Sequence, residues 1–132
     1  MNKAILFISA IALAFSPSLA SADNAMSDAE VLKTSNFSGE NGHEVSGEVQ
    51  IVQRGEIQYL VLLDDFQFDG APDPKLGFSL NGEFVEESLF SGLNLDQGKQ
   101  IYRLPVDFDA EAYDEVTVWC DKFDVSLAEA KY

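Results

Sequence analysis

Short runs in which apolar and polar residues alternate are the feature of this sequence that most restricts its fold. In the run 45–52 (VSGEVQIV), an apolar residue or a glycine stands at every second position. This period of two is typical of a strand with one buried face. The same period returns in 76–80 (LGFSL) and in 116–120 (VTVWC). The run 57–63 is apolar at nearly every position, which predicts a central strand covered on both faces.

The segments between these runs are rich in residues that favour turns. Asn81-Gly82 is a pair that accepts positive φ and predicts a two-residue hairpin turn. The segment 64–74 (DDFQFDGAPDP) indicates a loop, and Pro105 ends a strand predicted over 100–104. The segment 109–113 predicts one helical turn. Many short strands and almost no helical periodicity predict an all-β chain, an antiparallel β-sandwich of about seven or eight strands.

The alternating pattern changes phase after the strand predicted at 116–120. Cys120 shares a face with Val116 and Val118, whereas the apolar residues of 123–127 would fall in register with Trp119. A bulge or a tight turn at Asp121-Lys122 accounts for this change, because it re-aims the side chains that follow it. We therefore expect Cys120 at the end of a strand, beside a backbone irregularity.

The first 22 residues predict a signal peptide. Asn2-Lys3 gives a short positive start, 4–15 is almost wholly apolar, and Ala20-Ser21-Ala22 fits a signal-peptidase site. The apolar stretch is too short to span a bilayer, so we expect cleavage after Ala22 and no membrane insertion afterwards.

After cleavage, we expect a periplasmic or extracellular protein with one domain. Its organisation would be a flexible tail at 23–32, which is small and polar, followed by a single β-sandwich domain at 33–132.

The charge balance narrows the class of partner. Eight Lys and Arg residues stand against 23 Asp and Glu residues, for a net charge of −15. A surface this negative works against binding to nucleic acid or anionic lipid and favours cations or a basic partner.

Cys120 is the only cysteine, so it cannot form a disulfide within the chain. Three roles stay open for it: a small buried apolar residue, a redox-active or ligating sulfur, or a bridge to another chain. Its acidic neighbours Asp114, Glu115 and Asp121, opposed only by Lys122, disfavour an activated free thiol. They do not disfavour a ligand, because a bound metal itself deprotonates the sulfur.

His43 is the only histidine, which limits the metal chemistry of the chain. One histidine and one cysteine are too few for a structural zinc site in a monomer, and the Cys-x-x-Cys-His signature of covalent haem is absent. A cysteine-protease pair with Cys120 lacks any flanking signature. Haem held between His43 and Cys120 would use two known axial ligand types, provided the fold brings them together. The ordinary alternative is a solvent-exposed or backbone-bonded histidine.

Four aspartates, Asp64, Asp65, Asp69 and Asp73, form a second cluster in the predicted loop. Such oxygen-rich loops can hold Ca²⁺, although the spacing is not that of an EF-hand. The alternative is that the carboxylates cap backbone amides in turns. The aromatic residues are interpreted as core: Phe66, Phe68, Phe78, Phe84, Phe90, Phe108, Trp119 and Phe123.

Several segments, taken in order, resemble one known family. They are 36–38 (NFS), 42–52 (GHEVSGEVQIV), 65–66 (DF), 70–73 (GAPD), 102–105 (YRLP) and 113–123 (YDEVTVWCDKF), with Ala128 and Ala130 after them. In this order they are similar to the DM13 domain, also called the electron-transfer DM13 domain, over residues 33–132.

The resemblance implies an all-β extracellular domain that takes part in redox chemistry. The family cysteine, proposed to act as a free thiol or through a prosthetic group such as haem, corresponds to Cys120, and the family histidine corresponds to His43. In animals the domain is often joined to DOMON domains, which bind haem or sugar. This chain carries none, so electrons would come from a separate redox partner protein that the sequence does not identify.

The leading hypothesis is therefore a small exported redox or electron-transfer module in which Cys120 works and the prosthetic group is unknown, with haem as one candidate. The sequence favours a module that is not an enzyme by itself. Two alternatives stay open: a non-enzymatic binding or adhesion module with a buried structural cysteine, and a surface domain stabilised by Ca²⁺.

Overall fold

The computed structural model of the chain describes residues 28–132, and its regular structure there is almost entirely β. The only helical elements in this part of the chain are two 3-10 turns, η1 (Glu86–Ser88) and η2 (Ala110–Ala112). None of its helices is long and apolar enough to cross a membrane. The predicted signal peptide at 1–22 and the first five residues of the predicted tail lie outside the described residues.

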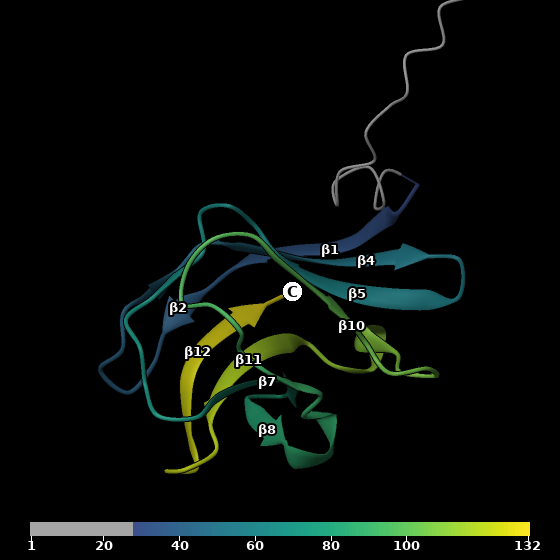
Figure 1. Cartoon of the computed structure of the whole chain (residues 1–132). Coiled ribbons are helices and arrows are strands. Elements are labelled where there is room, and N and C mark those ends of the chain that lie inside the picture. The colour runs from purple at the N-terminus through teal and green to yellow at the C-terminus, as the bar shows by residue number, and fades with distance from the viewer. Residues whose placement is uncertain (1–27) are drawn as a thin grey trace, which may run out of the picture.

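The strands pair antiparallel and form two facing sheets, which together make a β-sandwich (Figure 1). The four-stranded sheet has the order β1 (Glu30–Asn36), β4 (Glu48–Arg54), β5 (Ile57–Leu62) and β10 (Gln100–Arg103). The six-stranded sheet has the order β2 (Ser38–Gly39), β12 (Val125–Lys131), β11 (Glu115–Cys120), β7 (Pro74–Leu80) and β8 (Glu83–Val85), with β9 (Ser91–Gly92) also paired to β7. A separate ribbon pairs β3 (Val45–Ser46) with β6 (Gln67–Phe68). The all-β antiparallel sandwich predicted from the sequence is thus confirmed.

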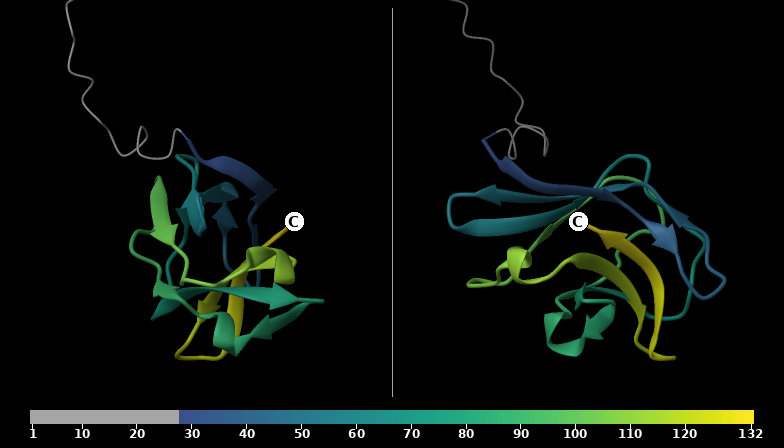
Figure 2. Two further views of the ribbon diagram at one scale, coloured as in Figure 1. Left: turned by 90° about the vertical axis from the view of Figure 1, so that its right-hand side faces the viewer. Right: turned by 180° about the vertical axis from the view of Figure 1, so that it is seen from behind.

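The hydrophobic core lies between the two sheets, which appear as separate layers in two further views of the molecule (Figure 2). The four-stranded sheet contributes inward residues such as Ile51, Leu60 and Leu62, and the six-stranded sheet contributes Phe78 and Val118. Alternate positions face inward because successive side chains of a strand point to opposite faces. The hairpin predicted at Asn81-Gly82 is present and joins β7 to β8, with φ of 54° and 81° at its two turn residues.

The irregularity predicted after Cys120 is also present, in two parts. A turn over 121–124 follows the strand, and Asp124 has a φ of 52°. In addition, the pairing of β11 with β12 shifts register between Val118 and Trp119. Cys120 is the last residue of β11, as expected.

Gly47 divides the single strand that the sequence predicted over 45–52. Its φ is +111°, and a Cβ at this position would lie 2.5 Å from the Cα of Phe66. The chain turns sharply here because only glycine tolerates both this φ and this close backbone contact. The result is two strands, β3 and β4, that belong to different sheets.

Two further expectations need correction. The tail predicted over 23–32 overlaps β1, which begins at Glu30 because its backbone pairs with β4. Phe123, interpreted as core, is 60% exposed, since it lies in the turn after β11 and not on a strand face. Phe84 and Trp119 are only partly buried, and they stack on each other at a centroid distance of 4.1 Å.

Candidate functional site

His43 lies in a turn that two hydrogen bonds hold in place. The His43 backbone N–H donates to the carbonyl of Glu40 at 3.0 Å. The Asn41 side-chain amide donates to the Ser126 carbonyl on β12 at 2.7 Å. Asn41 and Gly42 both have positive φ, which closes the turn and presents His43 just before β3. The two bonds therefore fix the backbone that carries the imidazole, and the His43 side chain is 26% exposed.

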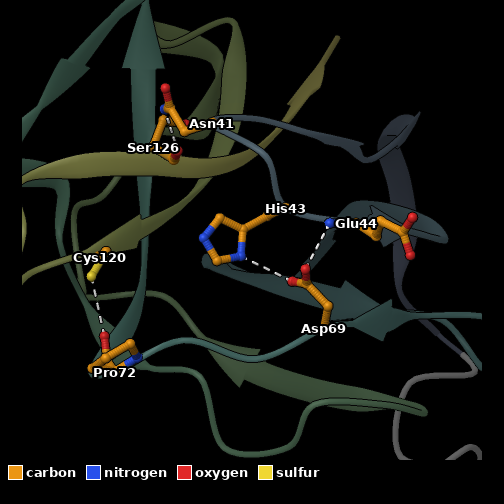
Figure 3. Close-up of polar contacts among 7 residues, drawn as sticks. All are labelled: Asn41, His43, Glu44, Asp69, Pro72, Cys120 and Ser126. Atoms are coloured by element: carbon orange, nitrogen blue, oxygen red, sulfur yellow. Dashed lines mark hydrogen bonds and ion pairs between the residues drawn. The ribbon is translucent and has the colours of Figure 1, made fainter.

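Asp69 orients the His43 ring (Figure 3). Its Oδ1 lies 3.0 Å from His43 Nδ1, and its Oδ2 accepts a hydrogen bond of 3.0 Å from the backbone N–H of Glu44. The Asp69 backbone N–H donates in turn to the Glu44 carbonyl at 3.1 Å. The Glu44 N–H, and after it the His43 side chain, hold the pKa of the Asp69 carboxyl below its usual value.

This pairing determines which ring nitrogen of His43 is available. An ionised carboxylate accepts hydrogen bonds only, so the neutral imidazole carries its proton on Nδ1. The lone pair then lies on Nε2, which points away from Asp69 (Figure 3). A carboxylate behind a histidine is also the common arrangement in metal sites, where it fixes the ring and raises its basicity.

The His43 ring lines an open cavity of about 480 Å³. Phe68 lies beside the ring, with a centroid distance of 6.2 Å. The walls come from the end of β2, from the residues just before β3, from both strands of the β3–β6 ribbon and from the residue after β6; they are Gly39, His43, Glu44, Val45, Ser46, Gln67, Phe68 and Asp69. The cavity is accessible to a ligand and has a mixed polar and apolar lining.

Cys120 occupies a different environment. It is 1% exposed and belongs to the hydrophobic core. Its thiol donates a hydrogen bond of 3.2 Å to the carbonyl of Pro72 (Figure 3). The sulfur is thus packed in the core and already hydrogen-bonded to the backbone.

The structure does not bring Cys120 into the cavity of His43. Cys120 is not among the residues that line it, and the polar partner of each side chain is a different residue. The two positions are connected through the backbone, because Asp69 and Pro72 belong to one four-residue segment (69–72). This segment bonds His43 at one end and Cys120 at the other.

The four aspartates of the predicted Ca²⁺ cluster act separately. Asp65 Oδ1 accepts a hydrogen bond of 2.9 Å from the Glu48 backbone N–H, and Asp73 lies 3.6 Å from Lys75 Nζ. Asp64 is exposed in the turn after β5, and Asp69 bonds His43. Within residues 28–132, no three His, Cys, Asp or Glu side chains gather in a metal-binding arrangement.

The role of Asp69 as the partner of His43 was missed from the sequence. The two residues are 26 positions apart and come together only because β3 pairs with β6. Two-residue strands give no periodic signal, so nothing in the sequence pattern could have predicted this pair.

The fold and this site define a small all-β domain with one oriented histidine in a cavity and one buried cysteine. Residues 36–132 match the family model described as electron transfer DM13. The chain therefore belongs to the electron transfer DM13 family, as its segments indicated. No curated protein and no solved structure gave a significant match.

Proposed function

We propose that this protein is an exported electron-transfer module that holds a redox-active prosthetic group at His43. The observation that carries this proposal is the His43–Asp69 pair, in which Asp69 holds Nδ1 of a histidine that lines an open cavity of about 480 Å³. The description of the family as an electron-transfer family supports the same class of function.

The donor set favours a prosthetic group that brings ligands of its own. A bare metal ion needs three or four protein ligands, and no such group is present within residues 28–132. Haem brings four nitrogen ligands of its own, and a histidine is a usual protein ligand to its iron. His43 would hold such a group through its ring, Asp69 would orient that ring, and Phe68 would offer an apolar contact. Such a group, when bound, would carry one electron at a time.

Two roles are open to Cys120 in this function. As a redox thiol or a ligand it would have to leave the core and release the Pro72 carbonyl. As a structural residue it anchors the segment that carries Asp69. Its 1% exposure favours the second role, and this burial is also what the alternative of a non-enzymatic binding module expects. Haemin binding by the His43 and Cys120 variants separates these two roles.

Titration of the purified mature protein with haemin provides that test. We expect a Soret band that saturates at one equivalent, is lost in His43→Ala and is weakened in Asp69→Asn. Because His43 is the only histidine, no other imidazole can substitute for it. A band that survives His43→Ala but disappears in Cys120→Ser would transfer the site to the cysteine, and the absence of any band would refute haem binding.

Export is a separate part of the proposal and rests on the sequence of the first 22 residues. Expression of the full chain in a bacterium should give a periplasmic or secreted protein whose N-terminus is Asp23, as measured by intact mass and N-terminal sequencing. Recovery of an uncleaved chain from the cytoplasm would contradict it.

A further inference from the structure

A second cavity lies on the outer face of the six-stranded sheet, around the only tryptophan of the chain. Val116, Val118 and Cys120 of β11 point into the core, so Trp119 must point outward. There it stacks face to face on Phe84 of β8, with a centroid distance of 4.1 Å and an interplanar angle of 8°. Both rings are only partly buried.

Gly77 on the neighbouring strand β7 explains why the Phe84 ring can pack closely against this face. A Cβ at Gly77 would come within 2.9 Å of the Phe84 ring. The absence of a side chain leaves room for the ring to pack over the sheet. The aromatic pair is thus held in place from below and leaves one side of the cavity as an aromatic surface.

Carboxylates form the rest of the cavity. Its volume is about 370 Å³, and besides the two rings it is lined by Glu86, Asp121 and Asp124. Lys75 bonds Asp121 at 2.6 Å and so neutralises one of the three. The side chains of Glu86 and Asp124 are exposed and make no ion pair within residues 28–132.

We propose that this cavity is a docking site for a basic side chain, arginine in preference to lysine, on the surface of a partner protein. A guanidinium stacks on an aromatic face and bonds carboxylates through its planar fork at the same time. Two unpaired carboxylates beside an aromatic pair present both of these contacts. The net charge of −15 adds long-range attraction for a basic partner.

The composition of the surface also suits a protein partner. Aromatic residues and arginine carry most of the binding energy in protein interfaces, and they cluster where a few side chains fill pockets. Phe123, which is 60% exposed, lies in the turn between Asp121 and Asp124 and does not line the cavity; Lys122 Nζ lies 5.5 Å from the centre of its ring. This site is separate from the His43 cavity and shares none of its lining residues, so it stands independently of the proposed prosthetic group.

Trp119 makes the proposal directly measurable, because all tryptophan fluorescence comes from the proposed site. The mature protein is titrated at millimolar concentrations with three acetylated and amidated peptides of the form Gly-X-Gly-X-Gly. In them X is arginine, lysine or citrulline, the last being the uncharged counterpart of arginine. We expect saturable quenching with arginine, weaker binding with lysine and none with citrulline. The arginine affinity should fall as NaCl rises from 20 to 200 mM.

Variants test the carboxylates. Glu86→Gln and Asp124→Asn should each weaken binding of the arginine peptide about threefold or more, as expected for the loss of one partly exposed ion pair. Glu56→Gln, an exposed glutamate in the β4–β5 turn of the other sheet, should change nothing. Far-UV circular dichroism verifies folding, and if one variant fails to fold, the other and the salt series still decide the question.

Three results would overturn the proposal: equal quenching by the citrulline peptide, unchanged binding in both carboxylate variants, or saturable quenching by a neutral oligosaccharide that does not depend on salt. The last would assign the aromatic pair to carbohydrate. Because the readout is peptide binding, its failure leaves the haemin titration at His43 unaffected.

Discussion

At the residue scale, Cys120 is defined by what surrounds its sulfur. The side chain is packed in the core and its thiol bonds the Pro72 carbonyl. A thiol reagent needs a path to the sulfur, and the folded protein offers none, because the side chain is 1% exposed. The acidic neighbours seen in the sequence pointed to an unreactive thiol, and burial adds a second physical reason.

Cys120 should therefore be inert to thiol reagents in the native protein and react at once after unfolding. A chromogenic disulfide reagent, added with and without denaturant, measures this with a single possible label site. Cys120→Ser should lower the free energy of unfolding by about 1–3 kcal/mol, since it places a more polar hydroxyl in the core. Cys120→Ala serves as the apolar comparison. Rapid labelling of the native protein would contradict this prediction and would support the hypothesis that Cys120 is a free redox thiol.

Glu115 is a second residue whose surroundings have a measurable effect. It is 6% exposed, and its Oε2 has no hydrogen-bond partner within residues 28–132. Burial, followed by the neighbouring carboxylates of Glu129 and Asp114, raises its pKa above the usual 4.5, and Lys131 only partly opposes them. Ionising this carboxyl is thus more costly in the folded chain than in the unfolded chain.

We expect this group to reduce stability as pH rises from about 4.5 through its raised folded pKa. Below 4.5 both states are protonated and the group has no effect; above the folded pKa the full cost is present. Glu115→Gln should raise the free energy of unfolding at pH 7 and flatten the pH dependence, measured by urea denaturation at pH 4–8. Glu56→Gln is the exposed control. In contrast to Glu115, Asp69 has a lowered pKa, so the stability that its ionised carboxylate contributes is lost as pH falls below 3.8. An unchanged pH profile in Glu115→Gln would contradict the assignment.

At the element scale, Gly47 separates β3 from β4 and so creates the ribbon that carries the site. Gly47→Ala should cost about 3 kcal/mol or more, because it combines an unfavourable φ with a clash against the Phe66 backbone. Gly55→Ala in the β4–β5 turn is the matched control: its φ is +63°, but a Cβ there meets nothing within 4 Å. It should cost about 1 kcal/mol. Urea denaturation measures both, and equal costs would show that the Phe66 contact is unimportant.

The strands β5, β7 and β11 and the tight hairpin could be predicted from the sequence, because each has a local signal. The seven-residue strand β1 was missed, and its first residues were assigned to the tail. Alternation identified β7 and β11, and Asn81-Gly82 identified the turn after β7. The two-residue strands β2, β6 and β9 could not be predicted, since their pairing depends on distant backbone, and the break at Gly47 that separates β3 from β4 was also missed. The candidate site shows the same limit. His43 was identified as the only histidine, whereas its partner Asp69 was grouped with aspartates that act elsewhere.

At the scale of the whole molecule, the excess of acidic residues affects stability as well as partners. Like charges repel more strongly in the compact state, and salt screens that repulsion. The melting temperature should therefore rise when NaCl is raised from 20 to 500 mM. An equal rise in KCl identifies screening. Ca²⁺ at matched ionic strength should add nothing further if the aspartates of 64–73 only cap turns; an additional rise would favour the Ca²⁺-stabilised alternative.

The segment 69–72 joins the His43 cavity to the buried Cys120 through one short stretch of backbone. One end fixes the imidazole of His43 and the other receives the thiol of Cys120. A ligand that tightens the first contact would restrain the second, and coupling between two sites is reciprocal by thermodynamic necessity. If the two contacts are coupled, Cys120→Ala, which removes the bond to Pro72, should change ligand affinity at His43 although the sulfur lies outside the cavity.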